Sequence, residues 1–414
     1  MDDITPSSIS YDHTTKKPDT TRLSKSISLS SQPSLPYLPS LDYQIPSSPP
    51  SSIHQCVTTL KGHSSYISSL AIHGNSLYTG SSDEQIRLWQ LPIPLEPAPL
   101  RDGPSSSTVA VTKSPIKSLL VSNSNYLFSS HQDHKIRVWR IGGKRKGKLL
   151  AVLPTVTDRI LSLASPEKYV EVRRHKRCTW VHHVDAVSAL ALSHDAAFLY
   201  SVSWDRTLKV WRTSDFRCTE SVGAAHDDAI NAVAVSGDGY VYTGSADTKI
   251  KVWKQPHGER KHSLVSTLER HRSAVNALAL SPDSFVLYSG ACDRSVIVWE
   301  GGGCGGQMEA TGVLRGHKKA ILCLATAGEL VCSGSADRTV RLWRRGEDKG
   351  YSCLAVLEGH GGAIKSLAVA GAAADFYTDG SSGHETNSAY FVCSGGMDCD
   401  VKVWKLLIPS FKVS

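Results

Sequence analysis

The sequence predicts an all-β protein built from seven copies of one short unit. The first observation is a spacing, because an Asp stands six residues before a Trp seven times between residues 83 and 404. The second is a Ser or Thr four residues before each of these Asp. The third is a His ahead of six units, followed four residues later by an Ile or Val that starts a short apolar run. Repetition of this kind is typical of arrays of one supersecondary unit, and the apolar runs indicate buried strands.

The repeated polar residues form seven sets. In chain order they are His63, Thr79, Asp83 and Trp89; Ser129, Asp133 and Trp139; His183, Ser201, Asp205 and Trp211; His226, Thr243, Asp247 and Trp253; His271, Ser289, Asp293 and Trp299; His317, Ser333, Asp337 and Trp343; and His360, Ser394, Asp398 and Trp404. Grouped Ser, His and Asp suggest a hydrolase, but catalysis needs one exposed site with an oxyanion hole, and these groups recur in every unit. A structural role is therefore the favoured interpretation.

The units resemble WD repeats, and Leu60-Lys-Gly-His63 through Leu88-Trp89 is a full example. The resemblance spans residues 53–407 and implies a seven-bladed WD-repeat β-propeller with one four-stranded sheet per blade. It also implies a hydrogen-bonded chain through the His, hydroxyl, Asp and Trp of each blade. The residue after each Trp departs from the family's usual Asp, as in Gln90, but this departure is frequent in the family.

The domain boundaries follow from composition and repeat positions. Residues 1–52 hold 14 Ser and 8 Pro and predict a disordered tail. The repeats lie at about 60–91, 109–141, 181–213, 224–255, 269–300, 315–345 and 358–407. Residues 53–60 precede the first His and predict a closing strand paired with the last blade, an insertion at 154–180 is expected on the top face, and 408–414 form a short C-terminal tail.

The second unit breaks the pattern, because Thr112 stands where a His is expected. A polar chain without its imidazole leaves a buried partner unpaired. The sequence therefore predicts that the second blade is the least rigid.

Composition limits the functional classes. No run of about 18 uncharged apolar residues is present, and the start Met-Asp-Asp lacks the character of a secretory signal. The ten cysteines contain no Cys-x-x-Cys pair, which is typical of free thiols in a reducing compartment. We therefore expect a protein of the cytoplasm, with the nucleus as a second location, that does not act at a membrane.

The net charge of +8 does not by itself favour nucleic acid, because six of the seven residues two before the Trp are basic and belong to the repeat. Gly142 to Lys148 has phosphate-loop spacing, but Leu149 replaces the required Ser or Thr. The group His175, Cys178, His182 and His183 fits no zinc template. We expect neither cofactor nor metal.

The candidate binding residues come from loops that the resemblance places on one face of the propeller, its top. Arg206, Arg294 and Arg338 directly follow the repeated Asp, Trp204 directly precedes one, and Tyr66, Arg272, Lys318 and Lys319 follow His positions. Arg173 and Arg174 belong to a cationic run in the 154–180 insertion. Exposed aromatic rings among Arg and Lys are typical of a peptide-binding surface. The sequence predicts a protein or peptide partner there, acidic or phosphorylated.

A narrower resemblance rests on Tyr169-Val-Glu-Val-Arg-Arg-His175, Asp185-Ala-Val-Ser and Ser31-Gln-Pro-Ser-Leu-Pro36. These segments resemble the JINGUBANG-like group of plant WD-repeat proteins. The resemblance implies a non-enzymatic interaction scaffold or adaptor, a plant regulatory protein with a signalling or transcription-factor partner. The alternative is a substrate receptor of a cullin-type ubiquitin ligase, although the Trp-Asp-x-Arg ending used by many such receptors is absent from every blade end.

Overall fold

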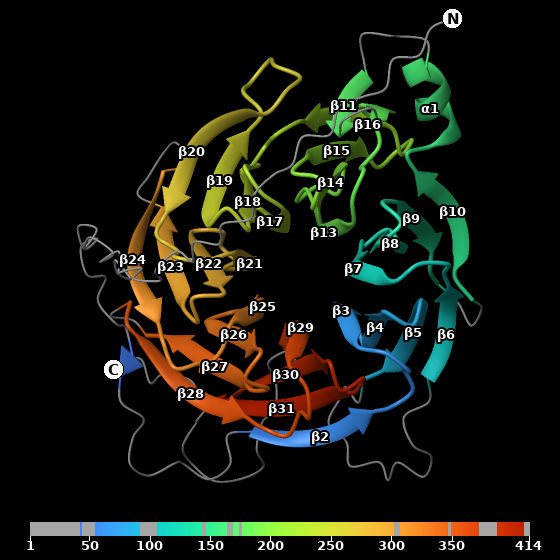
Figure 1. Ribbon diagram of the computed structural model, residues 1–414. Helices are drawn as coiled ribbons and strands as arrows, with labels where there is room; N and C mark the ends of the chain where they lie inside the picture. Colours follow the sequence, from blue (N-terminus) through green and yellow to red (C-terminus); the bar gives the residue numbers. More distant parts are fainter. Residues whose placement is uncertain are drawn as a thin grey trace, which may run out of the picture. The chain divides into compact units, whose positions relative to one another are not determined.

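The computed structural model describes residues 42–43, 54–91, 106–142, 146–163, 169–173, 176–301, 307–346, 349–371 and 387–409. Nearly all of the regular secondary structure in this part of the chain is β-strand, and all strands except β1, β11 and β12 form seven four-stranded antiparallel sheets, the blades of a propeller (Figure 1). The seven-bladed all-β fold expected from the repeats is confirmed.

The blades are numbered in chain order, and their strands run from the centre of the ring outward. Blade 1 is β3 (Ile67–His73), β4 (Ser76–Ser81), β5 (Gln85–Gln90) and β6 (Ser106–Val111). Blade 2 is β7 (Ile116–Val121), β8 (Tyr126–His131), β9 (Ile136–Arg140) and β10 (Lys148–Leu153). Blade 3 is β13 (Val187–Leu192), β14 (Phe198–Ser203), β15 (Leu208–Arg212) and β16 (Cys218–Val222). Blade 4 is β17 (Ile230–Val235), β18 (Val241–Ser245), β19 (Lys249–Lys254) and β20 (Ser263–Glu269).

The remaining blades follow the same order. Blade 5 is β21 (Val275–Leu280), β22 (Val286–Ala291), β23 (Val296–Gly301) and β24 (Met308–Leu314). Blade 6 is β25 (Ile321–Ala327), β26 (Leu330–Ser335), β27 (Val340–Arg345) and β28 (Tyr351–Leu357). Blade 7 is β29 (Ile364–Gly371), β30 (Asn387–Gly396), β31 (Val401–Pro409) and β2 (His54–Leu60).

The ring is closed by β2, which pairs antiparallel with β31 from His54 opposite Leu406 to Leu60 opposite Val401. The outer strand of the last blade thus comes from the beginning of the described propeller, at the position where the sequence analysis put 53–60. The innermost strands contact one another all the way round, and β29 of blade 7 contacts β3 of blade 1 (Figure 1). Because the ring is closed, each blade packs against a neighbouring blade on both faces.

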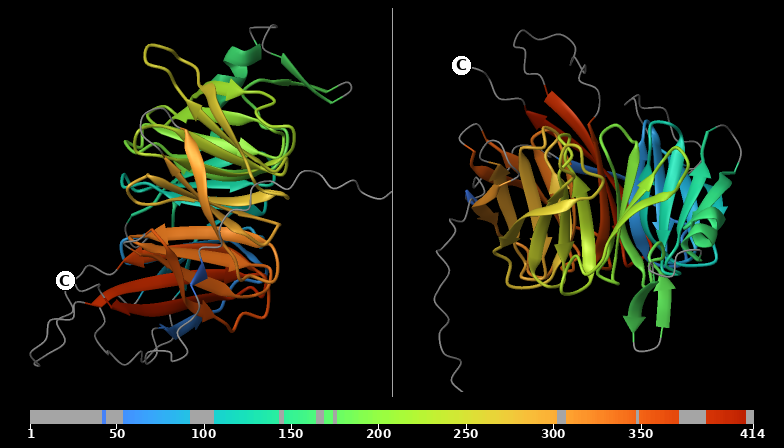
Figure 2. Two further views of the ribbon diagram at one scale, coloured as in Figure 1. Left: turned by 90° about the vertical axis from the view of Figure 1, so that its left-hand side faces the viewer. Right: turned by 90° about the horizontal axis from the view of Figure 1, so that it is seen from above.

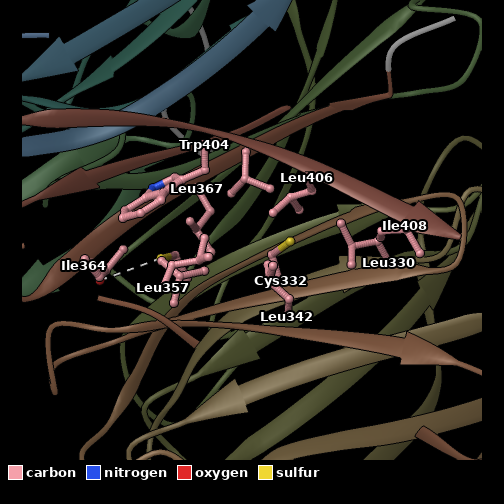
Figure 3. Close-up of a cluster of buried hydrophobic side chains, with 12 residues drawn as sticks. Leu330, Cys332, Leu342, Leu357, Ile364, Leu367, Trp404, Leu406 and Ile408 are labelled. Atoms are coloured by element: carbon pink, nitrogen blue, oxygen red, sulfur yellow. Dashed lines mark hydrogen bonds between the residues drawn. The ribbon is translucent and has the colours of Figure 1, made fainter. Parts of the chain in front are cut away.

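The hydrophobic core is divided into clusters that lie between neighbouring blades. In Figure 3, Leu330, Cys332 and Leu342 of blade 6 pack with side chains of blade 7 such as Trp404 and Leu406. Glycine on the second strand allows this close approach, because a Cβ at Gly290 would lie 2.5 Å from Cγ2 of Ile321 on the next blade. Blade contacts therefore depend on small residues at the crossing point.

The chain termini of the propeller differ from the expected boundaries. A two-residue strand, β1 (Asp42–Tyr43), pairs parallel with β28 of blade 6, so residues 1–52 are not entirely without structure. The other residues of that segment lie outside the described residues. The expected C-terminal tail at 408–414 is also too long, because β31 continues to Pro409 opposite Asn387.

The insertion at 154–180 contains regular structure that the sequence analysis missed. Helix α1 (Val156–Leu163) begins with a capping box, in which the Asp158 amide donates to Thr155 Oγ1 (3.2 Å) and the Thr155 amide donates to Asp158 Oδ2 (3.4 Å). A hairpin of β11 (Tyr169–Arg173) and β12 (Lys176–Thr179) follows. Figure 2 shows that this hairpin projects from the face opposite the one from which β31 extends. Because β31 ends on the side of the β29–β30 connection, the hairpin lies on the other face, the one called the top here.

Candidate protein-binding surface

Six blades contain a four-membered polar chain. The Trp Nε1–H donates to the Ser or Thr hydroxyl at 2.8–3.0 Å in all six. The hydroxyl lies 2.7–2.9 Å from His Nε2. The His Nδ1 lies 2.8–3.1 Å from an Asp oxygen. A neutral imidazole with its proton on Nδ1 satisfies every group, because the hydroxyl can donate to Nε2 and Nδ1–H can donate to the carboxylate.

The ionisation of these groups agrees with a neutral His beside a charged Asp. Burial lowers the pKa of His226, against the opposing effect of Asp247. Burial alone would raise the pKa of Asp205, but the charge and hydrogen bond of His183, with further bonds from Thr207 and the Val184 amide, lower it well below its usual range. The polar chains therefore hold carboxylates ionised in partly buried positions.

In the six blades with a loop His, the Asp also fixes the turn between the second and third strands. In blade 3 the other oxygen of Asp205 accepts the Thr207 amide at 2.9 Å, and the intervening Arg206 adopts a left-handed conformation with φ of 68°. The residue after the Asp has φ of 67–74° in all seven blades, at Glu84, His134, Arg206, Thr248, Arg294, Arg338 and Cys399. This conformation is costly for a residue other than glycine. In the six blades with a loop His, the carboxylate thus helps to hold the backbone of the following residue in this conformation at the rim.

The turns and the His-bearing loops lie on the same rim. In every blade the amide of the residue before the Asp donates to a backbone oxygen of the loop that enters the blade, as in Ser82 N to Tyr66 O (3.1 Å) and Met397 N to Ala363 O (2.8 Å). The seven blades share this bond. A single rim, the top, therefore presents two short segments from each blade.

Blade 2 has a complete polar chain built from a different residue. His131 lies on β8, and its Nε2 lies 2.8 Å from Ser129 Oγ, to which Trp139 Nε1–H also donates at 2.8 Å. The other nitrogen of His131 donates to the Ser114 carbonyl at 3.1 Å. Thr112, at the expected His position, instead donates to backbone oxygens. The premise that blade 2 lacks an imidazole is wrong.

Because His131 binds a carbonyl, the Asp of blade 2 has no His partner. Asp133 forms a bidentate ion pair with Arg137, at 3.1 and 2.6 Å. His131 was missed because its position is occupied by small residues, Ser, Ala or Gly, in the other six blades. The signal that could have identified His131 is a large polar residue two positions after the repeated Ser or Thr, where the other six units have a small residue.

The structure brings five of the predicted binding residues together. Arg272 and Arg294 lie on the top rim of blade 5, and Lys318, Lys319 and Arg338 lie on that of blade 6. All five side chains are exposed, and these neighbouring blades are joined by the bond from Asn276 Nδ2 to Ile321 O (2.8 Å). We call these five residues the cationic arc. Within the described residues none of the five forms an ion pair with a carboxylate.

The other predicted residues lie elsewhere on the top rim. Tyr66 is half-buried in blade 1, and Arg206 is exposed in blade 3. Trp204 is 41% exposed, and Lys117 Nζ of blade 2 lies 5.0 Å from the centre of its ring. Between blades 3 and 5, blade 4 presents Asp227 and Asp228. The rim therefore carries charges of opposite sign on adjacent blades.

The two predicted residues of the insertion are placed less fully. Arg173 ends β11, and Arg174 lies outside the described residues.

The phosphate-loop motif joins β9 to β10, so that Lys148 begins a strand where such a loop requires a helix. His183 is occupied in the polar chain of blade 3, and the described residues contain no group of three or more possible metal ligands.

A pocket of about 400 Å³ adjoins the cationic arc on blade 6. Its lining includes Lys318 and Arg338 of the arc, Arg341 of β27 and Val356 of β28. The loop that enters blade 7 contributes Glu358 to the opposite side. Arg341 was assigned by the sequence analysis to the repeat architecture, so its place in a pocket was missed.

Comparison with known proteins shows to which family the chain belongs. The family model of the WD domain, G-beta repeat, matches residues 54–90, 175–212, 217–254, 262–300, 308–344 and 351–405. The chain belongs to the WD40 family. The match omits β7 to β10, the blade in which His131 replaces the loop His. WD40 propellers generally act as non-catalytic scaffolds that bind protein partners.

The chain is similar to parts of several WD40 proteins. It is 29% identical over 173 residues to the small ribosomal subunit protein RACK1 of Drosophila melanogaster, covering 39% of this chain and 52% of that protein. It is 33% identical over 123 residues to a probable cytosolic iron-sulfur protein assembly protein 1 of Chaetomium globosum, covering 24% of this chain and 27% of that protein. The chain thus spans about half or less of these relatives.

The solved WD40 β-propeller domain of Doa1 has a similar fold, with a TM-score of 0.60 and 20% identity over 85% of this chain and 96% of that one. This likeness concerns the fold alone. Among the described residues no helix has the length and apolar character to cross a membrane.

Proposed function

We propose that this WD40 protein is a non-enzymatic interaction scaffold that binds an acidic linear segment of a protein partner across the cationic arc. The observation that carries the proposal is that five exposed cations lie on two adjacent blades without a carboxylate partner among the described residues. Unpaired Arg and Lys can pair with carboxylates or phosphates of a ligand, and Arg does so bidentately.

The geometry of the rim supports binding of an extended segment. Arg294 and Arg338 both follow a turn-fixing Asp, with φ of 68° and 71°, so the backbone at both residues is fixed before a partner binds. Pre-organised side chains lose less entropy when a partner binds. The acidic residues Asp227 and Asp228 on blade 4 would repel the same ligand, and this sets one end of the surface.

The finer function follows from the narrower resemblance. Tyr169 to His175 and Ser31 to Pro36 resemble plant JINGUBANG-like proteins, and on this ground we place the partner among signalling proteins or transcription factors of a plant. The cytoplasm, with the nucleus as a second location, is proposed from the composition of the chain.

The experiment compares charge reversals at equivalent turns. Full-length wild type, the double variant Arg294→Glu/Arg338→Glu and the single variant Arg206→Glu are used to capture partners from an extract of the source cells, quantified by mass spectrometry. Arg206 is the matched control, because it occupies the same turn position in blade 3 with φ of 68°. We expect the double variant to lose at least about tenfold of the captured partner, as two charge-assisted contacts are replaced by repulsion. Arg206→Glu should retain it.

Melting temperatures of all three proteins check that the fold is intact. Equal capture by the double variant and the wild type would contradict binding at the arc. Equal losses in both variants would show that the arc is not the site.

A further inference from the structure

The basic residues two positions before the blade Trp have oxygen partners in five blades. Arg87 donates to Gln85 Oε1 (3.1 and 3.2 Å), and Arg137 pairs with Asp133. The lysines of blades 3, 4 and 7 donate to a hydroxyl or a carbonyl, namely Lys209 to Ser221 Oγ (2.6 Å), Lys251 to Ala225 O (2.7 Å) and Lys402 to Thr59 Oγ1 (3.2 Å). Each of these five basic side chains thus has a hydrogen-bond acceptor within its own blade.

Arg341 of blade 6 is the exception. Its cross-strand partner on the outer strand is Val356, whereas Lys209, Lys251 and Lys402 face Ser221, Thr267 and Thr59. Within the described residues, the guanidinium of Arg341 makes a weak hydrogen bond, from Nη1 to Cys353 Sγ at 3.7 Å. Its Nε is buried and has no acceptor. A buried donor of a charged group without a partner is costly and needs an explanation.

The carboxylate of blade 6 that corresponds to Asp133 of blade 2 is already occupied. Asp337 accepts hydrogen bonds from His317 Nδ1 (2.9 Å), the Lys318 amide (2.9 Å) and the Thr339 amide (3.0 Å) and hydroxyl (2.7 Å). In blade 2 the corresponding Asp is free to pair with Arg137, because no loop His binds it. A complete polar chain in blade 6 therefore leaves Arg341 without a carboxylate.

Arg341 lines the pocket beside Lys318 and Arg338. Three cations thus line a space of about 400 Å³, together with the carboxylates of Glu358 and Asp337. Asp337 is already hydrogen-bonded within its own blade. The lining keeps an excess of about one positive charge, and its two Arg side chains can pair with phosphate oxygens bidentately. The position of the pocket next to the cationic arc would let one peptide occupy both.

We propose that this pocket binds the phosphoryl group of a phosphoserine or phosphothreonine in the partner's peptide segment. The proposal rests on the proposed function, because it names the residue that the bound segment carries. Arg341 supplies guanidinium donors from β27, Lys318 and Arg338 supply charge from the top rim, and Val356 opposite Arg341 offers no side-chain acceptor that would compete with the ligand.

The test uses degenerate peptide libraries as probes. Three libraries with identical flanking positions carry phosphoserine, Ser or Glu at the centre, and full-length protein is assayed for the amount of each that it retains. We expect phosphoserine to be retained at least about tenfold more than Ser, with Glu between them, because Arg binds phosphate bidentately. Binding should weaken below about pH 6, where phosphate loses its second charge.

Three variants test the pocket residues. Arg341→Met should abolish the preference for phosphoserine, while Arg87→Met, its equivalent in blade 1, should keep it. Val356→Thr keeps every charge but offers Arg341 the hydroxyl that Lys402 receives from Thr59, so it should weaken phosphopeptide binding several-fold. Glu358→Gln removes the opposing carboxylate and should strengthen binding.

The outcomes separate this proposal from the proposed function. Equal retention of the phosphoserine and Ser libraries, or an unchanged preference in folded Arg341→Met, would overturn the pocket assignment. If the Arg294→Glu/Arg338→Glu variant then retained less of the Glu library than the wild type, the scaffold function would stand without the pocket. Competition by inorganic phosphate without any peptide preference would indicate a small-anion site and would also overturn the proposal.

Discussion

Blade 2 and blade 4 reach the same buried polar chain by different routes. In blade 4 the imidazole comes from the entering loop, where His226 joins Thr243 to Asp247. In blade 2 it comes from β8, two residues after Ser129, and ends on a backbone carbonyl. The Trp-to-hydroxyl bond is 2.9 Å in one blade and 2.8 Å in the other.

The difference shows that the buried chemistry is more constant than the motif. A Trp N–H and a buried hydroxyl need an acceptor with a second nitrogen that can donate onward, and either position can supply it. The loop His, however, also ties the Asp of the turn to the loop, whereas His131 does not. Blade 2 therefore has a half-buried Asp–Arg ion pair at its rim in place of a buried His–Asp pair.

The largest expected effect is the dependence of stability on pH that comes from His131 of blade 2. Burial, with a smaller contribution from Arg137, lowers the pKa of His131 from 6.5 to about 4. Below pH 6.5 the unfolded chain binds a proton that the folded chain refuses, so stability falls until about pH 4 and is unaffected above pH 6.5. The loss amounts to about 3 kcal/mol across this window.

The check is urea unfolding of wild type and His131→Gln at several pH values between 6.5 and 4. The variant should start less stable at pH 7 and lose less stability as the pH falls. Parallel curves for the two proteins would show that His131 is not the group held neutral.

A second variant pair compares the two kinds of Asp. Asp205 of blade 3 accepts bonds from His183, the Val184 amide and Thr207, and its side chain is 2% exposed. Asp205→Asn should cost about 2 kcal/mol, because the amide group must face buried donors. Asp133→Asn removes a partly exposed ion pair and should cost about 0.5 kcal/mol. Denaturant midpoints measure both, and equal costs would mean that the His–Asp bond adds nothing to blade stability.

The smallest expected effect concerns presentation of the arc. Arg338 has φ of 71°, which glycine adopts without strain. Arg338→Gly should raise the unfolding free energy by about 0.5 kcal/mol, since relief of strain is partly offset by a more flexible unfolded chain. The same variant should bind the acidic partner less well. Differential scanning calorimetry and the capture assay measure the two effects, and a destabilised variant would contradict a strained turn held for binding.

Much of the fold could be predicted because its signals are local in the sequence. The Asp-to-Trp spacing reflects one tight turn and one strand, and the unpaired segment at 53–60 indicated a strand for blade 7. His131 was missed because its role depends on the side chain facing inward beside Ser129. Helix α1 was missed because its capping box lies within an irregular insertion.

The candidate site could be predicted only in outline. Its exposed residues follow repeat positions, but which of them meet depends on the order of blades around the ring. The pairing of Arg341 with Val356 could not be predicted, because the β27–β28 register shifts at a bulge between Leu342 and Trp343. A one-residue change in this register would exchange the pocket-facing side chains.

Hydrogen exchange of the full-length protein with and without a captured partner measures the central claim most directly. The account predicts new protection at the top rim of blades 5 and 6, within residues 272–274, 292–295, 317–320 and 336–341, with little change at the equivalent turns of blades 1 to 3. Protection confined to the opposite rim, at turns such as 193–198 and 236–240, would contradict recognition by the cationic arc.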